Sequence, residues 1–378
     1  MGSYAVVLLA AFVTTFLLTP LFRLASIRTG AVVPPGERRI HETPLPTLGG
    51  AAMLAGFLVA MGVAWRLAYF RPVFEASSAP LGIVVAAIVI YAVGQLDDLR
   101  KIGLAGGEGD GVSPPAKMAG MVLAGSILSL AGVSTIFLRV PFGGIFSLSP
   151  DLSTFITVLW VVGMANALNF IDGLDGLCAG IVAIASGAFF LYGHRLENVD
   201  VLRPGNIGPL LAVVTLGICL GFLPHNFHPA RIIMGDAGAL LLGLLMAAST
   251  MAVGGSTDTE YSGQTFFFFA PLVIPLFILG VPILDTAFAI ARRATRRANP
   301  AGADKEHLHH RLMRLGHGQR RSVLILWAWT AILSALVLYP TYTGRGDAVV
   351  PLGVAGLGLI LYTIFHPGVR RSRADVDA

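Results

Sequence analysis

Long apolar stretches dominate this 378-residue sequence and limit the folds that it can adopt. Only 12% of the residues are charged and 55% are hydrophobic, whereas a soluble domain carries roughly 25% charged residues. A helix of about 20 apolar residues crosses the hydrocarbon core of a bilayer, and many segments of the chain approach that length. The sequence therefore predicts an all-α polytopic membrane protein and excludes an ordinary soluble domain.

We expect about eleven transmembrane helices, or ten if one of the short, glycine-interrupted segments is re-entrant. No internal repeat and no insertion of domain size interrupts them, which indicates one membrane domain over residues 1–378. The longest polar segment, 292–321, is a basic loop too short to fold alone. The expected helices cover 4–22, 47–70, 80–96, 118–138, 152–168, 177–193, 208–224, 237–254, 266–291, 322–340 and 347–366.

The basic residues divide unequally between the two sides of this arrangement. With the N-terminus outside, the loops on the cytoplasmic side and the C-terminal tail carry 20 of the 26 Lys and Arg residues, and the external side carries 6. Short cytoplasmic loops collect Lys and Arg. The sequence thus predicts an external N-terminus and a cytoplasmic C-terminus, and the basic excess can also attract anionic lipid or a phosphorylated substrate.

Acids and amides gather at the expected cytoplasmic helix ends. Ionisable groups at membrane depth are costly, so such a cluster is a candidate site, and its one-sided position argues against a through-pore. Five carboxylates in one pocket require a counter-charge, and oxygen ligands favour Mg²⁺. Capping of a helix N-terminus is the alternative to a role in cation binding for Asp175 and Asp236, because each precedes an apolar run. The group comprises Asp97, Asp98, Asn166, Asn169, Asp172, Asp175, Asn226 and Asp236.

A second polar group lies in the 292–321 loop, on the same side. It could form a zinc site, a solvated charge run or a contact surface for phosphate. Adjacent histidines on a helix diverge and no cysteine lies nearby, which disfavours zinc. We favour a phosphate or sugar-phosphate contact, with the guanidinium as a bidentate donor. The residues are His307, His309, His310 and Arg311.

Five segments at these helix ends resemble, in order, motifs of the polyprenyl-phosphate N-acetylhexosamine-1-phosphate transferases, also called glycosyltransferase family 4. The histidine segment and the PHNFHPA run look most like the bacterial branch that uses UDP-N-acetylglucosamine. The matching segments are HETPLPTLGG (41–50), GQLDDLRK (94–101), NALNFIDGLDGL (166–177), PHNFHPARIIMGDAGALLLG (224–243) and DKEHLHHRL (304–312).

The resemblance implies transfer of N-acetylglucosamine 1-phosphate from UDP-N-acetylglucosamine to a polyprenyl phosphate, undecaprenyl or decaprenyl, with release of UMP. This reaction is the first membrane step of a cell-envelope glycan. The resemblance further implies Mg²⁺ as cofactor, with Mn²⁺ as a substitute, and a site on the cytoplasmic face of the bacterial inner membrane. A homodimer is one option for assembly, and we expect no nucleic-acid partner.

The resemblance also assigns roles residue by residue. It implies Asp236 as the Mg²⁺ ligand with Asn169 as a second candidate, and Asp97 and Asp98 as the acids that hold or deprotonate the lipid phosphate. Asp285 is open between a functional and a structural role. The expected catalytic set is Asp97, Asp98, Asp172, His309 and His310. The expected substrate-binding set is Asn166, Asn169, Asp175, Asn226, Lys117, His307, Arg311 and His41, with Asp175 and Asn226 as uridine contacts.

Two positions depart from the family pattern. Ile233 stands where many members carry an aromatic residue able to stack on uracil, and Met121 stands where glutamine is common. Three other functions are weighed against this one. They are the same chemistry with UDP-MurNAc-pentapeptide, a secondary transporter, for which the inverted repeats are missing, and an inactive relative, which is expected to lose some of the acids that this chain keeps.

Overall fold

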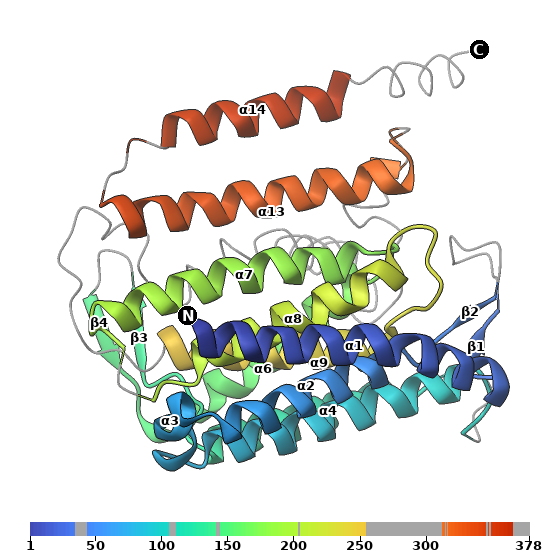
Figure 1. Ribbon diagram of the computed structural model, residues 1–378, viewed down its shortest axis with the longest axis horizontal. Coiled ribbons are helices and arrows are strands. Elements are labelled where there is room, and N and C mark those ends of the chain that lie inside the picture. The colour runs from blue at the N-terminus through green and yellow to red at the C-terminus, as the bar shows by residue number, and fades with distance from the viewer. Residues whose placement is uncertain are drawn as a thin grey trace.

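The computed structural model describes residues 1–34, 44–105, 111–140, 144–202, 205–254, 312–313, 315, 317–344, 347 and 349–365. Within them, ten helices of 17 or more residues run side by side (Figure 1). Eight of the ten are long and apolar enough to cross a membrane. The predicted all-α polytopic architecture is confirmed, whereas the orientation in the membrane and the single-domain organisation stay predictions.

Ten of the eleven expected segments coincide with a long helix. The segment at 266–291 lies outside the described residues. Short helices η1 (Ala68–Phe70) and α3 (Arg71–Glu75) connect the second and third long helices. The long helices are α1 (Gly2–Thr29), α2 (Gly49–Arg66), α4 (Ala79–Lys101), α5 (Pro114–Leu130), α6 (Pro150–Ile171), α7 (Leu177–Asn198), α8 (Gly208–Asn226), α9 (Gly235–Gly254), α13 (Gly318–Thr343) and α14 (Val349–Phe365).

Two short antiparallel ribbons, which the sequence analysis did not anticipate, lie at opposite ends of the bundle (Figure 1). In the first, β1 (Val32–Val33) pairs with β2 (Leu45–Pro46) between α1 and α2. In the second, β3 (Phe137–Val140) pairs with β4 (Gly144–Ser147) between α5 and α6. Helix α5 thus ends at Leu130, and residues 137–138 of the expected helix at 118–138 lie in β3 instead.

Helix α9 is the centre of the bundle, where it packs against α2, α4, α6, α7 and α8. Small residues let the neighbouring backbones approach closely. A Cβ on Gly243 of α9 would lie 2.5 Å from Cα of Ala165 in α6, and a Cβ on Gly94 of α4 would lie 2.6 Å from Cα of Ala237. The first turn of α9 is thus held directly against the last two turns of α4.

Helix α1 is tied to the end of α8 at a proline. Pro20 lacks the N–H that would pair with the carbonyl of Phe16 in a regular helix. Nε2 of His225 lies 3.0 Å from that carbonyl oxygen. Because the carbonyl can only accept, the imidazole donates from Nε2 and supplies the missing partner.

A polar cluster joins α1, η1 and α7 at the end of the bundle where the N-terminus lies (Figure 1). The carboxylate of Glu197 accepts hydrogen bonds from the hydroxyls of Tyr4, at 3.0 Å, and Tyr69, at 3.3 Å. Nδ1 of His194 lies 3.1 Å from the same carboxylate. The side chain of Tyr4 is buried, so its hydroxyl depends on this acceptor.

We expect Glu197→Ala to lower the free energy of unfolding by about 1–3 kcal/mol, because the buried Tyr4 hydroxyl loses its acceptor. Glu75→Ala is the matched control, since Glu75 is exposed at the end of α3 and such changes stay within about 0.5 kcal/mol. Denaturant unfolding in detergent measures both. Equal losses in the two variants would contradict a stabilising role for the cluster.

Candidate functional site

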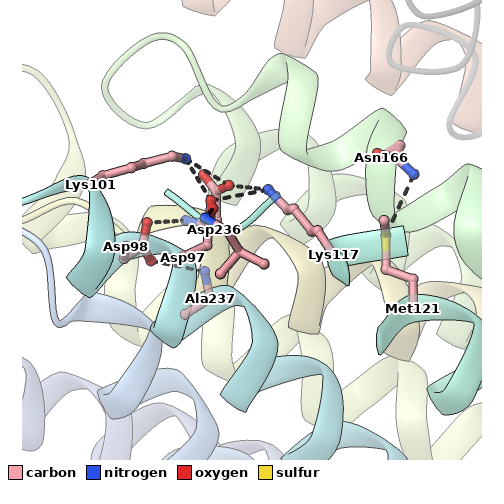
Figure 2. A network of polar contacts seen from close by, with 9 residues as sticks. Asp97, Asp98, Lys101, Lys117, Met121, Asn166, Asp236 and Ala237 are labelled. Atoms are coloured by element: carbon pink, nitrogen blue, oxygen red, sulfur yellow. Dashed lines mark hydrogen bonds and ion pairs between the residues drawn. The ribbon is translucent and has the colours of Figure 1, made fainter. Parts of the chain in front are cut away.

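The candidate site lies where the last turns of α4 meet the first turn of α9 (Figure 2). Asp97 and Asp98 stand near the end of α4, and Asp236 stands in the first turn of α9. Asp97 and Asp98 are 2% and 6% exposed. Three of the five predicted acids, two adjacent and the third 138 positions after Asp98, are therefore brought together.

Asp98 caps helix α9 from outside that helix. Its carboxylate accepts hydrogen bonds from the backbone N–H groups of Asp236, at 3.0 Å, and Ala237, at 3.1 Å. The first amides of a helix have no partner within the helix, so a buried acceptor here satisfies both. Gly235 has a φ of +67°, and a Cβ at this position would lie 2.3 Å from Oδ2 of Asp98. Only glycine fits this approach without strain.

Two lysines bridge Asp97 and Asp236. Nζ of Lys101 lies 2.7 Å from Oδ2 of Asp97 and 2.9 Å from Oδ2 of Asp236. Nζ of Lys117, at the start of α5, lies 3.3 Å from Oδ2 of Asp97 and also donates to Oδ2 of Asp236. The other oxygen of Asp97, Oδ1, accepts from the N–H of Val112 at 2.7 Å. Two carboxylate oxygens from separate helices thus converge on the same cations (Figure 2).

Lys101 is a site residue that the sequence analysis missed. A signal for it was available, because Lys101 follows Asp97 by four residues on one helix, the spacing that places opposite charges side by side.

The loop between α6 and α7 brings Asp172 toward this cluster. Asp172 follows directly after the last residue of α6. Burial raises the pKa of its carboxyl well above the ordinary value, and the negative charges of Asp236, Asp98 and Asp175 raise it further. Asp172 is therefore an electrostatic neighbour of the other acids, and its catalytic role stays a prediction.

The side-chain amides of Asn166 and Asn169, near the end of α6, make no hydrogen bond to the acids among the residues that the structure describes. Nδ2 of Asn166 donates to the carbonyl oxygen of Val162 at 2.8 Å and lies 3.5 Å from the sulfur of Met121 (Figure 2). Asn169 is partly buried in the last turn of α6 and makes no side-chain hydrogen bond with the residues that the structure describes. Roles for Asn166 in substrate binding and for Asn169 in metal binding stay predictions.

Asp175 and Asn226 organise the segment between α8 and α9. Oδ2 of Asp175 accepts from the N–H of Ala230 at 3.0 Å and lies 2.9 Å from Nδ1 of His228. Asn226 accepts from the N–H of Gly176 at 3.0 Å and donates to the carbonyl of Ile232 at 3.0 Å. Both side chains therefore fix the backbone beside the site, and their predicted contact with uridine stays a prediction.

A backbone brace, residues Pro46–Gly50, holds the two residues that precede Gly235. The N–H groups of Gly49 and Gly50 donate to the carbonyls of Ile233 and Met234 at 3.2 and 3.1 Å, and the N–H of Ile233 donates to the carbonyl of Pro46 at 3.0 Å. A Cβ on Gly50 would lie 2.6 Å from the backbone nitrogen of Gly238. The brace thus fixes the start of α9, and Thr47 of the brace lies beside Asp98 there, since a Cβ on Gly235 would lie 3.0 Å from Oγ1 of Thr47 and 2.3 Å from Oδ2 of Asp98.

Six of the predicted residues, including the whole histidine group, fall outside the described residues. They are His41, Asp285, His307, His309, His310 and Arg311.

The donor set fits a hard divalent cation that takes few ligands from protein. Among the described residues, no group of three or more His, Cys, Asp or Glu side chains has the arrangement of a metal centre. Asp97 and Asp236 nevertheless direct one oxygen each at the same pair of ammonium groups. Mg²⁺ is commonly held by one or two carboxylates, with waters and substrate phosphates as its other ligands. These two acids could hold it in that way.

Comparison with known proteins finds one family and several similar transferases. Residues 80–254 match the model of glycosyl transferase family 4. The chain is 37% identical, over 97% of its length and 89% of the relative, to a decaprenyl-phosphate N-acetylglucosaminephosphotransferase of Mycolicibacterium smegmatis. It is 35% identical, over 88% of its length and 84% of the relative, to a probable undecaprenyl-phosphate N-acetylglucosaminyl 1-phosphate transferase of Bacillus subtilis. Identity is 30%, over 80% of this chain and 86% of the relative, with a phospho-N-acetylmuramoyl-pentapeptide-transferase of Desulforudis audaxviator.

We expect Gly50→Ala to lower the free energy of unfolding by about 1–3 kcal/mol, since the added methyl group meets backbone that cannot yield without moving α9. Gly62→Ala on the same helix is the matched control, because a Cβ there meets nothing within 4 Å. Denaturant unfolding in detergent compares the two variants. A brace without structural importance would leave Gly50→Ala as stable as Gly62→Ala.

Proposed function

This chain belongs to glycosyl transferase family 4, and on that premise we propose that it transfers N-acetylglucosamine 1-phosphate from UDP-N-acetylglucosamine to a polyprenyl phosphate. The products are UMP and a polyprenyl-diphosphate-N-acetylglucosamine. The observation that carries this proposal is the convergence of Asp97 and Asp236 on one point beside Lys101 and Lys117. Such a site suits a reaction between two phosphate-bearing substrates, one soluble and one a membrane lipid.

In the proposed reaction an oxygen of the lipid phosphate attacks the β-phosphorus of the nucleotide sugar in line. The bond between that phosphorus and the bridging oxygen breaks, UMP leaves with the electron pair, and the bond between the sugar C1 and its oxygen stays intact. An aspartyl-phosphate intermediate is the alternative. A phosphate monoester loses its second proton near a pH of about 6, so the attacking group needs little help from a base. Positioning and charge stabilisation carry most of the catalysis.

The acids and lysines divide this work. Asp236 and Asp97 would hold Mg²⁺, which when bound neutralises charge on the diphosphate. Lys101 and Lys117 reach the same carboxylate oxygens, so their ammonium groups lie where phosphate oxygens would bind. Both carboxylate oxygens of Asp98 accept hydrogen bonds from amides of α9, which supports a positioning role for Asp98 rather than the role of a base. Asp172 lies beside these acids, and its raised pKa favours a protonated carboxyl, which would support the metal position without adding charge to it.

Sequence similarity favours N-acetylglucosamine as the transferred sugar. Identity reaches 37% with the Mycolicibacterium smegmatis protein named for N-acetylglucosamine and 30% with the Desulforudis audaxviator protein named for phospho-N-acetylmuramoyl-pentapeptide. The names of the relatives favour a transferase over a secondary transporter. We place the protein in the bacterial cytoplasmic membrane with this site at its cytoplasmic face, which is the side that the Lys and Arg distribution predicts.

We expect the purified protein in detergent to release UMP from UDP-N-acetylglucosamine when Mg²⁺ and a polyprenyl phosphate are present, and EDTA to abolish this release. Asp236→Asn should lower kcat by about 10²–10³-fold, the usual cost of removing a group that stabilises developing charge. Asp151→Asn is the matched control, because Asp151 is an exposed acid in the first turn of α6. Turnover that survives in Asp236→Asn at the rate of Asp151→Asn would refute the assignment.

The donor is tested in the same assay with UDP-MurNAc-pentapeptide. A protein specific for N-acetylglucosamine should release little UMP from this second nucleotide, because the bulky lactyl-peptide substituent needs its own pocket. Faster release from UDP-MurNAc-pentapeptide than from UDP-N-acetylglucosamine would contradict the proposed donor and favour the alternative one, with the same transfer reaction.

A further inference from the structure

The segment between α8 and α9 meets the turn between α6 and α7 through three consecutive residues. Asn226 accepts a hydrogen bond from the N–H of Gly176 at 3.0 Å, and Nδ1 of His228 lies 2.9 Å from Oδ2 of Asp175. Between them, Phe227 packs on Gly176, where an added Cβ would lie 3.0 Å from Cδ2 of the phenyl ring. The position of this turn therefore depends on the Phe227–His228 pair.

Helix α13 contacts the same Phe227–His228 pair. The ring centroids of Trp327 and Phe227 lie 5.6 Å apart, and Nε of Arg320 donates to the carbonyl oxygen of His228 at 3.2 Å. Trp327 follows Arg320 by seven residues, a spacing that places both on one face of the helix. The pair is thus in contact both with α13 and with the turn that carries Asp175.

Trp327 is fixed by its packing against α7, beside which α13 runs (Figure 1). A Cβ on Gly180 of α7 would overlap the indole ring, so a larger residue there would displace the ring. Nε1 of Trp327 is buried and makes no hydrogen bond with the residues that the structure describes, although a buried indole N–H usually has a partner. Ring packing alone therefore holds this side chain.

The turn between α6 and α7 carries two of the acids of the candidate site, Asp172 and Asp175. The pKa of Asp172 is raised first by burial and then by the negative charges of Asp236 and Asp98. The turn therefore lies within electrostatic range of the position proposed for the cation. A displacement of about 1 Å in a group that positions the reaction can cost about 10²-fold in rate.

We propose that Trp327 and Arg320 are positioning residues of the transferase site, which act through the Phe227–His228 pair on the turn that carries Asp172 and Asp175. The inference rests on the proposed function and adds α13 to the helices that build the site. Within the residues that the structure describes, neither side chain contacts an acid of α4 or α9. Each therefore acts only through the intervening loop.

Hydrogen exchange of the full-length protein in detergent, measured by mass spectrometry, tests the structural part without a substrate. Trp327→Leu should speed exchange in peptides covering 172–178 and 226–234 about 2–10-fold, the factor that an aromatic pair contributes to a local opening equilibrium. Trp329→Leu is the matched control. Trp329 lies on the same helix but packs against α14, where a Cβ on Gly356 would lie 3.6 Å from its ring.

The release of UMP tests the effect on catalysis. Trp327→Leu should lower kcat about 10–10²-fold, whereas Trp327→Phe, which keeps a ring beside Phe227 and loses no hydrogen bond, should restore most of it. Arg320→Met removes one hydrogen bond at an exposed position and should lower kcat about 2–10-fold. In a Phe227→Leu background, Trp327→Leu should cost little more, because both changes break the same contact.

Three results would overturn the proposal. The first is equal exchange at 172–178 and 226–234 in Trp327→Leu and Trp329→Leu. The second is a kcat loss from Trp327→Leu that simply adds to the loss from Phe227→Leu. The third is faster exchange along the whole chain in Trp327→Leu together with unchanged exchange and kcat in Arg320→Met, which would show a general loss of stability.

Failure of the proposed function would look different. The unaltered protein would then release no UMP from any nucleotide sugar, and the exchange measurement would still decide whether α13 positions the turn.

Discussion

The contact between the carboxylate of Asp98 and the first amides of α9 is the interaction on which the site depends. It joins residues 138 positions apart in the sequence and satisfies two backbone donors in a largely apolar bundle. Such donors are expensive to leave unpaired at membrane depth. Because Asp97 is the neighbour of Asp98 on α4 and Asp236 supplies one of the capped amides, the same contact also sets Asp97 against Asp236.

Close backbone packing makes this arrangement rigid. Gly94 and Gly243 let α4 and α6 approach α9, and the backbone brace at Pro46–Gly50 fixes the residues before Gly235. The repulsion between Asp97 and Asp236 is offset by Lys101 and Lys117. A pocket held in this way keeps its charged groups in place before a substrate arrives, which is the condition for electrostatic catalysis.

Much of the site could be predicted because helix ends on one side of a membrane are neighbours in space. Loop charges placed Asp97, Asp98 and Asp236 at the same boundary, and the structure brings them into contact. The pairing of Lys101 with Asp236 and the backbone contacts of Asn226 depend on partners distant in the sequence, which periodicity does not reveal. Helix α5 starts and ends earlier than predicted, because Pro114 begins it and Gly132, with φ +85°, follows its end.

Whether a divalent cation binds between α4 and α9 is tested most directly by a structure of the protein with Mn²⁺ and UDP, with anomalous scattering recorded at the manganese edge. We expect one anomalous peak within about 2–2.5 Å of a carboxylate oxygen of Asp236, the range of metal–oxygen bonds for hard divalent cations, and next to the diphosphate. A diphosphate bound without a peak at Asp236, or a peak coordinated only by other side chains, would contradict the proposed site.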